Sequence, residues 1–206
     1  MDLYFAPLSC SLASRIALYE AGIDAGFHQV TLATKTLPDG SDYRSVNPKG
    51  QVPALRTGDG AILTEGPAVL QYIADRVPDA RLAPPTGTFA RAQLQQWLNY
   101  ISTELHKAVF YMMFRPDTPQ EMKAFARNVL LPERLAYLQT HLSGRDTLLD
   151  TFSVADAYLV TVLGWAKIVG VDLAAYPAVA AYDARMLARP ALARAVKEEA
   201  ALRAVA

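Results

Sequence analysis

The chain has 206 residues, enough for one large domain or two small ones with a packed core. Its 52% hydrophobic and 19% charged residues exclude a disordered chain, and its 20 basic and 20 acidic residues indicate no nucleic-acid or anionic-membrane partner. No apolar run approaches the roughly 20 residues that span a bilayer. The N-terminus lacks the basic and apolar segments of a secretory signal, and a single cysteine cannot form an internal disulfide, so we expect a cytoplasmic protein.

Residues 1–77 predict a small α/β domain. The predicted strands cover residues 3–6, 27–32, 54–57 and 61–63. The last two flank Gly58-Asp59-Gly60, a hairpin turn signal. One helix is expected to follow the turn at residues 9–11 and to end at Gly22, and another to open at Glu65-Gly66. This order of elements is typical of a thioredoxin-like domain.

Residues 88–206 predict an all-α domain, after a proline-rich linker at residues 78–87. Helix breaks are expected at Asp117-Thr118-Pro119 and at Ser143-Gly144. The spacing of Ser153 and Asp156 predicts a capping box at the start of an apolar, central helix. The first helix carries apolar residues at helical spacing, namely Leu94, Trp97, Leu98, Ile101 and Leu105. Two later helices are expected to begin near Pro177 and Pro190.

Cys10 lies where the first predicted strand gives way to a helix N-terminus. The helix dipole and hydrogen bonds from Ser9 and Ser11 favour a thiolate, and such settings lower a thiol pKa from about 8.5 to about 3.5–7.5. Position 13 is alanine, so a redox cycle at this turn needs an external thiol such as glutathione. The alternative is a cysteine that packs as a small buried hydrophobe.

The stretch at residues 47–55 has the character of a binding loop. Proline cannot donate to a sheet ladder, so Pro53 belongs at a turn or at the first residue of a strand. A cis bond before it would turn the amide and carbonyl of Val52 outward, where they could pair with an extended peptide. Shortly after, the helix start at Glu65-Gly66 offers amides and a positive dipole end that suit a carboxylate. A loop that only starts a strand is the alternative interpretation.

These features together resemble the glutathione transferases over essentially the whole chain. The resemblance rests on the Val52-Pro53 loop, the Thr64-Glu65-Gly66 helix start, the Cys10 turn and residues 153–156. A cysteine in the turn, in place of a catalytic tyrosine or serine, resembles the beta-like, bacterial-type branch. The resemblance implies a thioredoxin-like N-terminal domain, an all-helical C-terminal domain, glutathione as co-substrate, no metal, and a homodimer.

The resemblance also implies which residues bind glutathione. Glu65 and Gly66 would hold its γ-glutamyl end, the Val52 backbone its cysteinyl part, and Lys35 its glycyl carboxylate. A solvated lysine is the alternative for Lys35. The full implied set is Lys35, Gln51, Val52, Pro53, Glu65, Gly66, Asn99, Glu104 and Lys107.

His106 shares a predicted helix face with Asn99. The resemblance places this face over the active-site turn, where His106 would donate to the sulfur and hold it as thiolate beside Cys10 and Ser11. Lys107 would add positive charge, and Asn99 and Glu104 would reach the glutathione of a partner subunit. A structural histidine is the alternative.

Large apolar residues follow on the same helix, at positions 110–114. They predict an apolar pocket for the second substrate, formed by Phe110 and Phe114 and closed by Trp165. Core packing or a dimer contact is the alternative, although methionine within the run suits an adaptable surface.

We therefore expect a glutathione transferase that conjugates glutathione to small hydrophobic electrophiles, as in detoxification. Thiol transfer through a mixed disulfide at Cys10 is the second expected activity. A non-catalytic ligand-binding or interaction module with a transferase-like fold is the alternative. Such a module would have no need of the intact set of Cys10, Val52-Pro53 and Glu65-Gly66.

Overall fold

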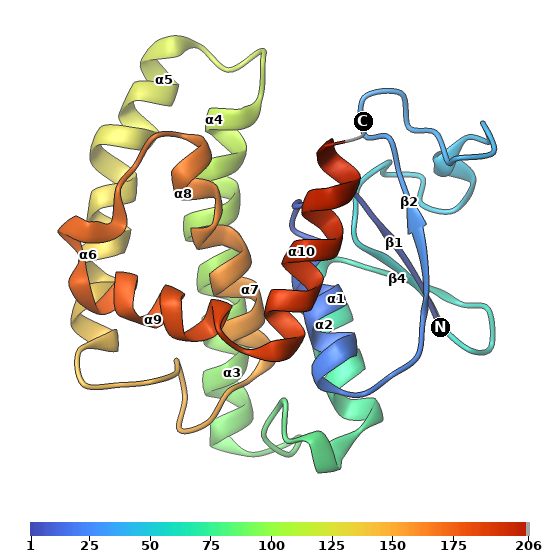
Figure 1. Ribbon diagram of the computed structural model, residues 1–206, viewed down its shortest axis with the longest axis horizontal. Coiled ribbons are helices and arrows are strands. Elements are labelled where there is room, and N and C mark those ends of the chain that lie inside the picture. The colour runs from blue at the N-terminus through green and yellow to red at the C-terminus, as the bar shows by residue number, and fades with distance from the viewer. Residues whose placement is uncertain (205–206) are drawn as a thin grey trace. The chain divides into compact units, whose positions relative to one another are not determined.

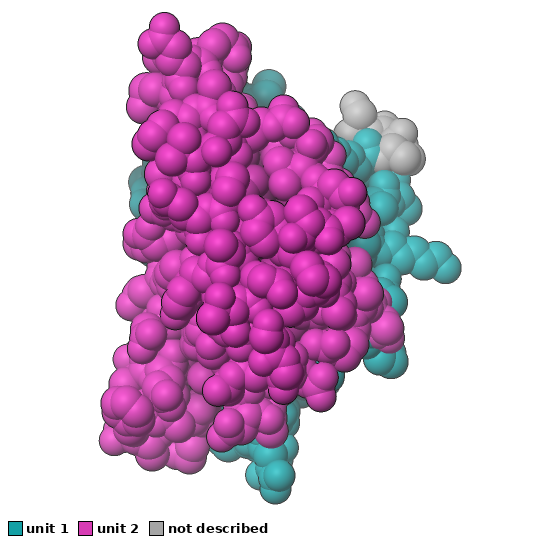
Figure 2. All heavy atoms as spheres, turned by 90° about the vertical axis from the view of Figure 1, so that its left-hand side faces the viewer, with its two compact units in different colours: residues 1–83, 189–206 teal, residues 84–188 magenta. Residues whose placement is uncertain are grey.

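The computed structural model describes residues 1–204 and contains two compact units. The first joins residues 1–83 to the segment that begins at Arg189, and the second spans residues 84–188 (Figure 2). The predicted range 88–206 counts the last helix with the second domain, whereas the contacts group it with the first unit.

A four-stranded sheet forms the centre of the first unit. Its strands are β1 (Asp2–Phe5), β2 (Gly26–Gln29), β3 (Ala54–Arg56) and β4 (Ile62–Thr64). The order across the sheet is β2-β1-β3-β4; β1 runs parallel to β2 and antiparallel to β3, which runs antiparallel to β4. Leu3, Tyr4 and Phe5 of β1 are buried. The sheet confirms the predicted thioredoxin-like domain.

Three helices accompany this sheet: α1 (Leu12–Glu20), α2 (Gly66–Arg76) and α10 (Pro190–Ala204). Helix α1 packs against α2 and also against α10, the red helix beside it in Figure 1. This packing explains why α10 belongs to the first unit. Short 3-10 turns at Tyr43–Ser45 (η1) and Pro78–Ala80 (η2) complete the unit.

The second strand is shorter than the sequence predicts. The Val30 amide still donates to the Phe5 carbonyl at 2.7 Å, but the chain then turns, and the Lys35 amide donates back to the Thr31 carbonyl at 2.8 Å. The apolar alternation at residues 27–32 therefore continues beyond the last strand residue, Gln29, into a turn.

The second unit is entirely helical. One continuous run comprises α3 (Phe89–Tyr100), π-helical turns η3 (Ile101–Tyr111) and α4 (Met112–Phe114), and a second comprises α5 (Gln120–Phe125), π-helical turns η4 (Ala126–Leu130) and α6 (Leu131–Leu142). The later elements are α7 (Val154–Leu163), α8 (Trp165–Ile168), η5 (Leu173–Ala175) and α9 (Pro177–Leu187). The helical C-terminal fold is confirmed. Among the described residues, no helix has the length and apolar character needed to cross a bilayer.

Helix α7 is the buried centre of this unit, since all ten of its residues are buried. Its start carries the predicted capping box, in which the Ser153 amide donates to Asp156 at 2.8 Å. The same carboxylate also accepts from the Leu148 amide at 2.9 Å and from the Tyr182 hydroxyl at 2.9 Å. Asp156 therefore joins α7, α9 and the preceding loop as well as capping a helix.

Candidate active site

The Cys10 thiol lies against the loop that the sequence singles out for peptide binding. Cys10 is in the turn between β1 and α1, and its Sγ donates to the Val52 carbonyl oxygen at 3.1 Å. The side chain is only half-buried. The bond joins residues 42 positions apart, so the fold of the first unit brings the two predicted features together.

The turn that presents Cys10 is held from within. Ser11 is fully buried, and its hydroxyl accepts from the Ala6 amide at 3.1 Å and meets the Ser9 hydroxyl at 2.8 Å. Just before the turn, Leu8 has φ +58°, a left-handed conformation that non-glycine residues seldom adopt. The structure thus places Ser11 in the framework of the turn, with its hydroxyl directed at the backbone.

The Val52–Pro53 peptide bond is cis, and Pro53 leads into β3. The carbonyl of the preceding Gln51 accepts from the Tyr43 hydroxyl at 2.9 Å and from the Asn47 side-chain amide at 2.6 Å. Tyr43 and Asn47 are both buried. The loop is therefore anchored from the protein interior, while the Gln51 side chain stays exposed.

Glu65 forms the second part of the site. It precedes α2 with φ +71°, and its exposed carboxylate pairs with Lys49, whose Nζ also donates to the Thr64 hydroxyl at 2.8 Å. At the start of α2, Pro67 has no amide hydrogen, and the Ala68 and Val69 amides donate to the Glu65 carbonyl. The Gly66 amide is then the donor that an incoming carboxylate would meet.

The Lys35 side chain lies against the loop at residues 47–53, at Gly50. Lys35 also has a positive φ, +61°, and its side chain crosses Gly50 so closely that a Cβ there would come within 3.2 Å of the lysine Cδ. Gly50 itself has φ +60°, a conformation that favours glycine, and the Lys35 side chain would have to shift if a Cβ were added. Within residues 1–204, three of the four non-glycine residues with positive φ, namely Leu8, Lys35 and Glu65, thus lie around the loop at residues 47–53 or the Cys10 turn. Such strain is typical of functional sites.

In the second unit, His106 lies in an aromatic setting. Its Nδ1 is 2.7 Å from the Tyr158 hydroxyl, and its ring centroid is 5.0 Å from that of Trp165. Burial lowers the pKa of His106 to about 4, and the neighbouring Lys107 charge acts in the same direction. The imidazole is therefore neutral near pH 7, when it can donate one hydrogen bond and accept another.

The three predicted pocket residues meet in this setting. Trp165 contacts both Phe110 and Phe114 edge to face, each at 5.7 Å between ring centroids. Phe110 is fully buried, whereas Phe114 is 43% exposed. The cluster therefore has a buried base and an open rim, the arrangement that an apolar binding surface needs.

The other predicted residues on this helix have partners within the second unit. Glu104 pairs with Arg134 at 2.9 Å, and the Lys107 ammonium lies 4.4 Å from the centroid of the Tyr111 ring. Asn99 has an exposed side chain, and its backbone carbonyl accepts from the Thr103 hydroxyl at 3.0 Å.

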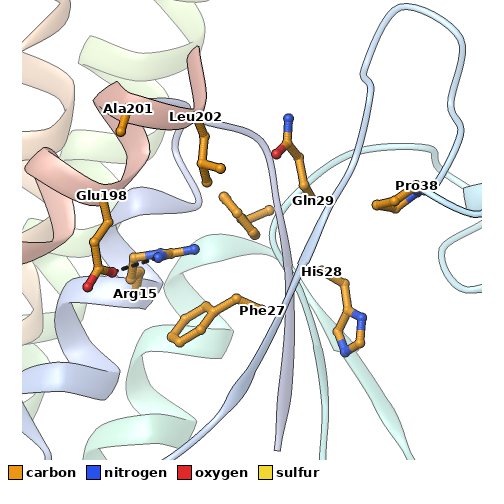
Figure 3. Close-up of a pocket in the computed structure, with 9 residues that line it drawn as sticks. Arg15, Phe27, His28, Gln29, Pro38, Glu198, Ala201 and Leu202 are labelled. Carbon is orange, nitrogen blue, oxygen red and sulfur yellow. Dashed lines mark hydrogen bonds and ion pairs between the residues drawn. The ribbon is translucent and has the colours of Figure 1, made fainter. Parts of the chain in front are cut away.

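A cavity of about 580 Å³ lies elsewhere in the first unit (Figure 3). Its lining residues are Phe5, Arg15, Phe27, His28, Gln29, Pro38, Glu198, Ala201 and Leu202. That lining includes none of the predicted glutathione-binding residues. Within the described residues, no group of three or more His, Cys, Asp and Glu side chains could hold a metal ion.

Two protein-family models match this chain. Residues 9–76 match the family model "Glutathione S-transferase, N-terminal domain", and residues 101–190 match "Glutathione S-transferase, C-terminal domain". The chain is 46% identical over 200 residues to the glutathione S-transferase GstA of Escherichia coli O157:H7, which covers 97% of this chain and 98% of the relative. This chain belongs to the glutathione S-transferase family.

Solved structures of two other transferases superpose on this transferase over nearly its full length. A sphingomonad glutathione S-transferase complexed with glutathione is 45% identical, with a TM-score of 0.93 over 97% of this chain and 99% of that one. A bacterial beta-class glutathione S-transferase from Sphingomonas chungbukensis is 42% identical, with a TM-score of 0.92 over 97% and 98%. The predicted family, fold, enzyme class and co-substrate are confirmed, and the non-catalytic alternative is not favoured.

Sequence reasoning missed three residues that hold this transferase's site elements. Lys49 pairs with Glu65, Tyr158 meets His106, and Glu199 on α10 accepts a hydrogen bond from Leu8, two residues before Cys10. Helical spacing could have revealed Glu199, because it follows the buried Leu192 and Ala195 on one face of α10. Lys49 and Tyr158 carry no comparable signal in the sequence.

Proposed function

We propose that this transferase binds glutathione along the loop at residues 47–53, with the thiol of the peptide beside Cys10. The observation that carries the proposal is the 3.1 Å contact between Cys10 Sγ and the Val52 carbonyl oxygen, because it puts a thiol on the backbone edge expected to pair with the peptide. In this assignment the Val52 backbone binds the cysteinyl part, with Gln51 and Pro53 on either side.

The two ends of glutathione have chemically suitable partners. The Glu65 carboxylate would bind the α-amino group of the γ-glutamyl end, and the Gly66 amide at the N-terminus of α2 would bind its carboxylate. The Lys35 ammonium would bind the glycyl carboxylate. Lys49 now neutralises Glu65, so we expect this ion pair to open or to be shared when the ligand binds.

Conjugation then needs a glutathione thiolate and an electrophile. The thiolate attacks the electrophilic carbon, a carbon–sulfur bond forms, and the leaving group departs with its electron pair. We assign to His106 the role of donating a hydrogen bond to this sulfur, as a neutral imidazole. Phe110, Phe114 and Trp165 would hold the electrophile, and their aromatic faces favour an aromatic or otherwise flat apolar molecule.

Cys10 supports a second reaction of the same site. Its thiolate would attack the glutathione sulfur of a mixed disulfide, form a Cys10–glutathione disulfide and release the other thiol. A second glutathione thiolate would then attack that bond, which regenerates Cys10 and yields oxidised glutathione. The chain has one cysteine, so an external thiol must complete the cycle.

We also propose a two-fold homodimer in the cytoplasm, in which Asn99 and Glu104 reach the partner's glutathione and Lys107 adds positive charge. The exposed Asn99 side chain supports this role, whereas Glu104 would have to leave Arg134 or share it. Light scattering at micromolar concentration, with activity measured alongside, tests the dimer. An active monomer would exclude the shared site.

Calorimetric titration with glutathione tests the binding site. Glu65→Gln should weaken binding about tenfold, because it removes a charge-assisted hydrogen bond. Asp146→Asn is the matched control, since Asp146 is also exposed and paired with a cation, Arg185, but lies in the second unit and has no proposed role in binding. Equal affinity in the parent and the Glu65 variant would place glutathione elsewhere.

A further inference from the structure

The last helix reaches the active-site turn through a buried carboxylate. Glu199 of α10 is fully buried, and its Oε2 accepts a hydrogen bond from the Leu8 amide at 2.7 Å. These residues are 191 positions apart in sequence and both belong to the first unit. Leu8 is the left-handed residue two positions before Cys10, so the contact is made at the strained point of the turn.

The other carboxylate oxygen is held by Arg15 of α1. Glu199 Oε1 lies 3.0 Å from Arg15 Nε, and the Arg15 guanidinium lies 4.3 Å and 4.0 Å from the ring centroids of Phe5 and Phe27. Arg15 also pairs with Glu198 at 3.0 Å, the contact drawn in Figure 3. Phe5, Phe27 and Glu198 thus fix the guanidinium, and its ion pair with Glu199, which is not a hydrogen bond in geometry, restricts the carboxylate so that its second oxygen faces the Leu8 amide.

Leu8 needs such support. A left-handed conformation costs a non-glycine residue free energy, and it persists only where the surroundings enforce it. Without the carboxylate, the Leu8 amide would lose its hydrogen bond to Oε2, and the left-handed conformation would lose that support against rotation towards the right-handed region. The Ser9 amide, which donates to the Ala6 carbonyl at 3.1 Å, would move with it, and so would Cys10.

We propose that Glu199 is a positioning residue for Cys10: by holding Leu8 in its left-handed conformation, it keeps the thiol against the Val52 carbonyl. The inference rests on the proposed function only in taking Cys10 as the reacting thiol. Glu199 acts in this proposal through its contacts with Leu8 and Arg15.

The test uses the single cysteine of the full-length chain. Alkylation of Cys10 by iodoacetamide, followed by intact mass, gives a rate constant without any glutathione. Glu199→Leu removes the acceptor and keeps apolar bulk in the site, whereas Glu199→Gln keeps a carbonyl oxygen that can face the Leu8 amide. Glu198→Gln is the matched control, because Glu198 also pairs with Arg15 but does not contact Leu8.

We expect Glu199→Leu to change the alkylation rate of Cys10 about tenfold, and Glu199→Gln and Glu198→Gln to stay within about threefold of the parent. Adding Leu8→Gly to Glu199→Leu should restore the parent rate, because glycine adopts the left-handed conformation without cost. A purely structural role for Glu199 would not produce this rescue. Parent-like alkylation of Glu199→Leu, or an equal change in the Glu198 variant, would overturn the proposal.

If Glu199→Leu does not fold, amide exchange in the parent decides the question. The Leu8 amide should be protected from exchange by far more than an exposed turn amide, and rapid exchange would overturn the proposal. These readouts are independent of glutathione binding. Failure to bind glutathione, with the alkylation pattern intact, would reject the proposed function and leave the positioning role standing.

Discussion

His106 Nδ1 lies 2.7 Å from the hydroxyl oxygen of Tyr158, and the two rings meet edge to face at 6.0 Å between centroids. Because burial lowers the pKa of His106 to about 4, the pair joins two neutral groups at neutral pH. If the Tyr158 hydroxyl donates to Nδ1, the hydrogen of the ring sits on Nε2, which is the tautomer that a donor to a sulfur requires.

The His106 pair predicts a loss of stability in acid. The imidazole pKa is lowered in the folded chain, to about 4 from an ordinary 6.5, so between these values the unfolded chain binds the proton more tightly. Stability from this group is complete above pH 6.5 and is lost as pH falls to 4, by about 3 kcal/mol. Urea unfolding at several pH values should show a flatter profile for His106→Phe. Tyr158→Phe keeps the imidazole and should keep most of the slope; equal slopes for the parent and His106→Phe would contradict the assignment.

Removal of the Asp156 carboxylate should destabilise the chain more than removal of the Ser153 hydroxyl. Ser153→Ala should cost about 0.5–2 kcal/mol, the usual effect of a lost helix cap. Asp156→Ala should cost about 3 kcal/mol or more, because it leaves the Leu148 amide and the buried Tyr182 hydroxyl without their acceptor. Thermal unfolding measures both, and similar melting temperatures for the two variants would limit Asp156 to a capping role.

Cys10 should form a glutathione adduct under oxidising conditions. Incubation with oxidised glutathione should add one glutathione per chain by intact mass, and dithiothreitol should remove it. Cys10→Ser should abolish the adduct and any thiol-transferase activity, whereas conjugation should persist in part because its nucleophile is the sulfur of glutathione. A parent chain that never forms the adduct would leave Cys10 as a structural residue.

The aromatic cluster should affect conjugation through the second substrate. Phe114→Ala should raise the KM for an apolar aromatic electrophile about fivefold or more, because it removes the exposed rim of the cluster and one contact with Trp165. The KM for glutathione should not change. Phe89→Ala is the control, since Phe89 is 79% exposed and lies at the start of α3, away from this cluster in the sequence. An equal effect of both variants would remove the cluster from the substrate site.

Local sequence signals predicted the elements well. Ser153 and Asp156 are three positions apart, and the Cys10 turn and the start of α2 each depend on a few neighbouring side chains. Such features are determined within one helical turn, so residue types alone reveal them. The helix breaks at Asp117-Thr118-Pro119 and Ser143-Gly144 follow for the same reason.

The remaining features depend on contacts between distant segments. The apolar alternation at 27–32 predicted three strand residues too many at its end, because the strand pairing with β1 stops at Gln29 and only the Val30 amide still donates to Phe5. The Ala-rich last helix was predicted as a helix, but its partner was not, since the pairing of Arg15 with Glu199 joins segments some 180 residues apart. The only sign of this pairing in the sequence was the position of a charged residue, Glu199, on the apolar face of the last helix.

The grouping of α10 with the first unit has a consequence for how the chain is made. During synthesis, the sheet and α1 leave the ribosome first, yet α10 and Glu199 emerge only after every residue of the second unit. Domains generally fold as units as they emerge, so the helical unit can reach its final contacts before the unit that carries Cys10 does. The Cys10 turn would then acquire its contact with Glu199 near the end of synthesis, and a nascent chain would expose a thiol that is not yet held in place.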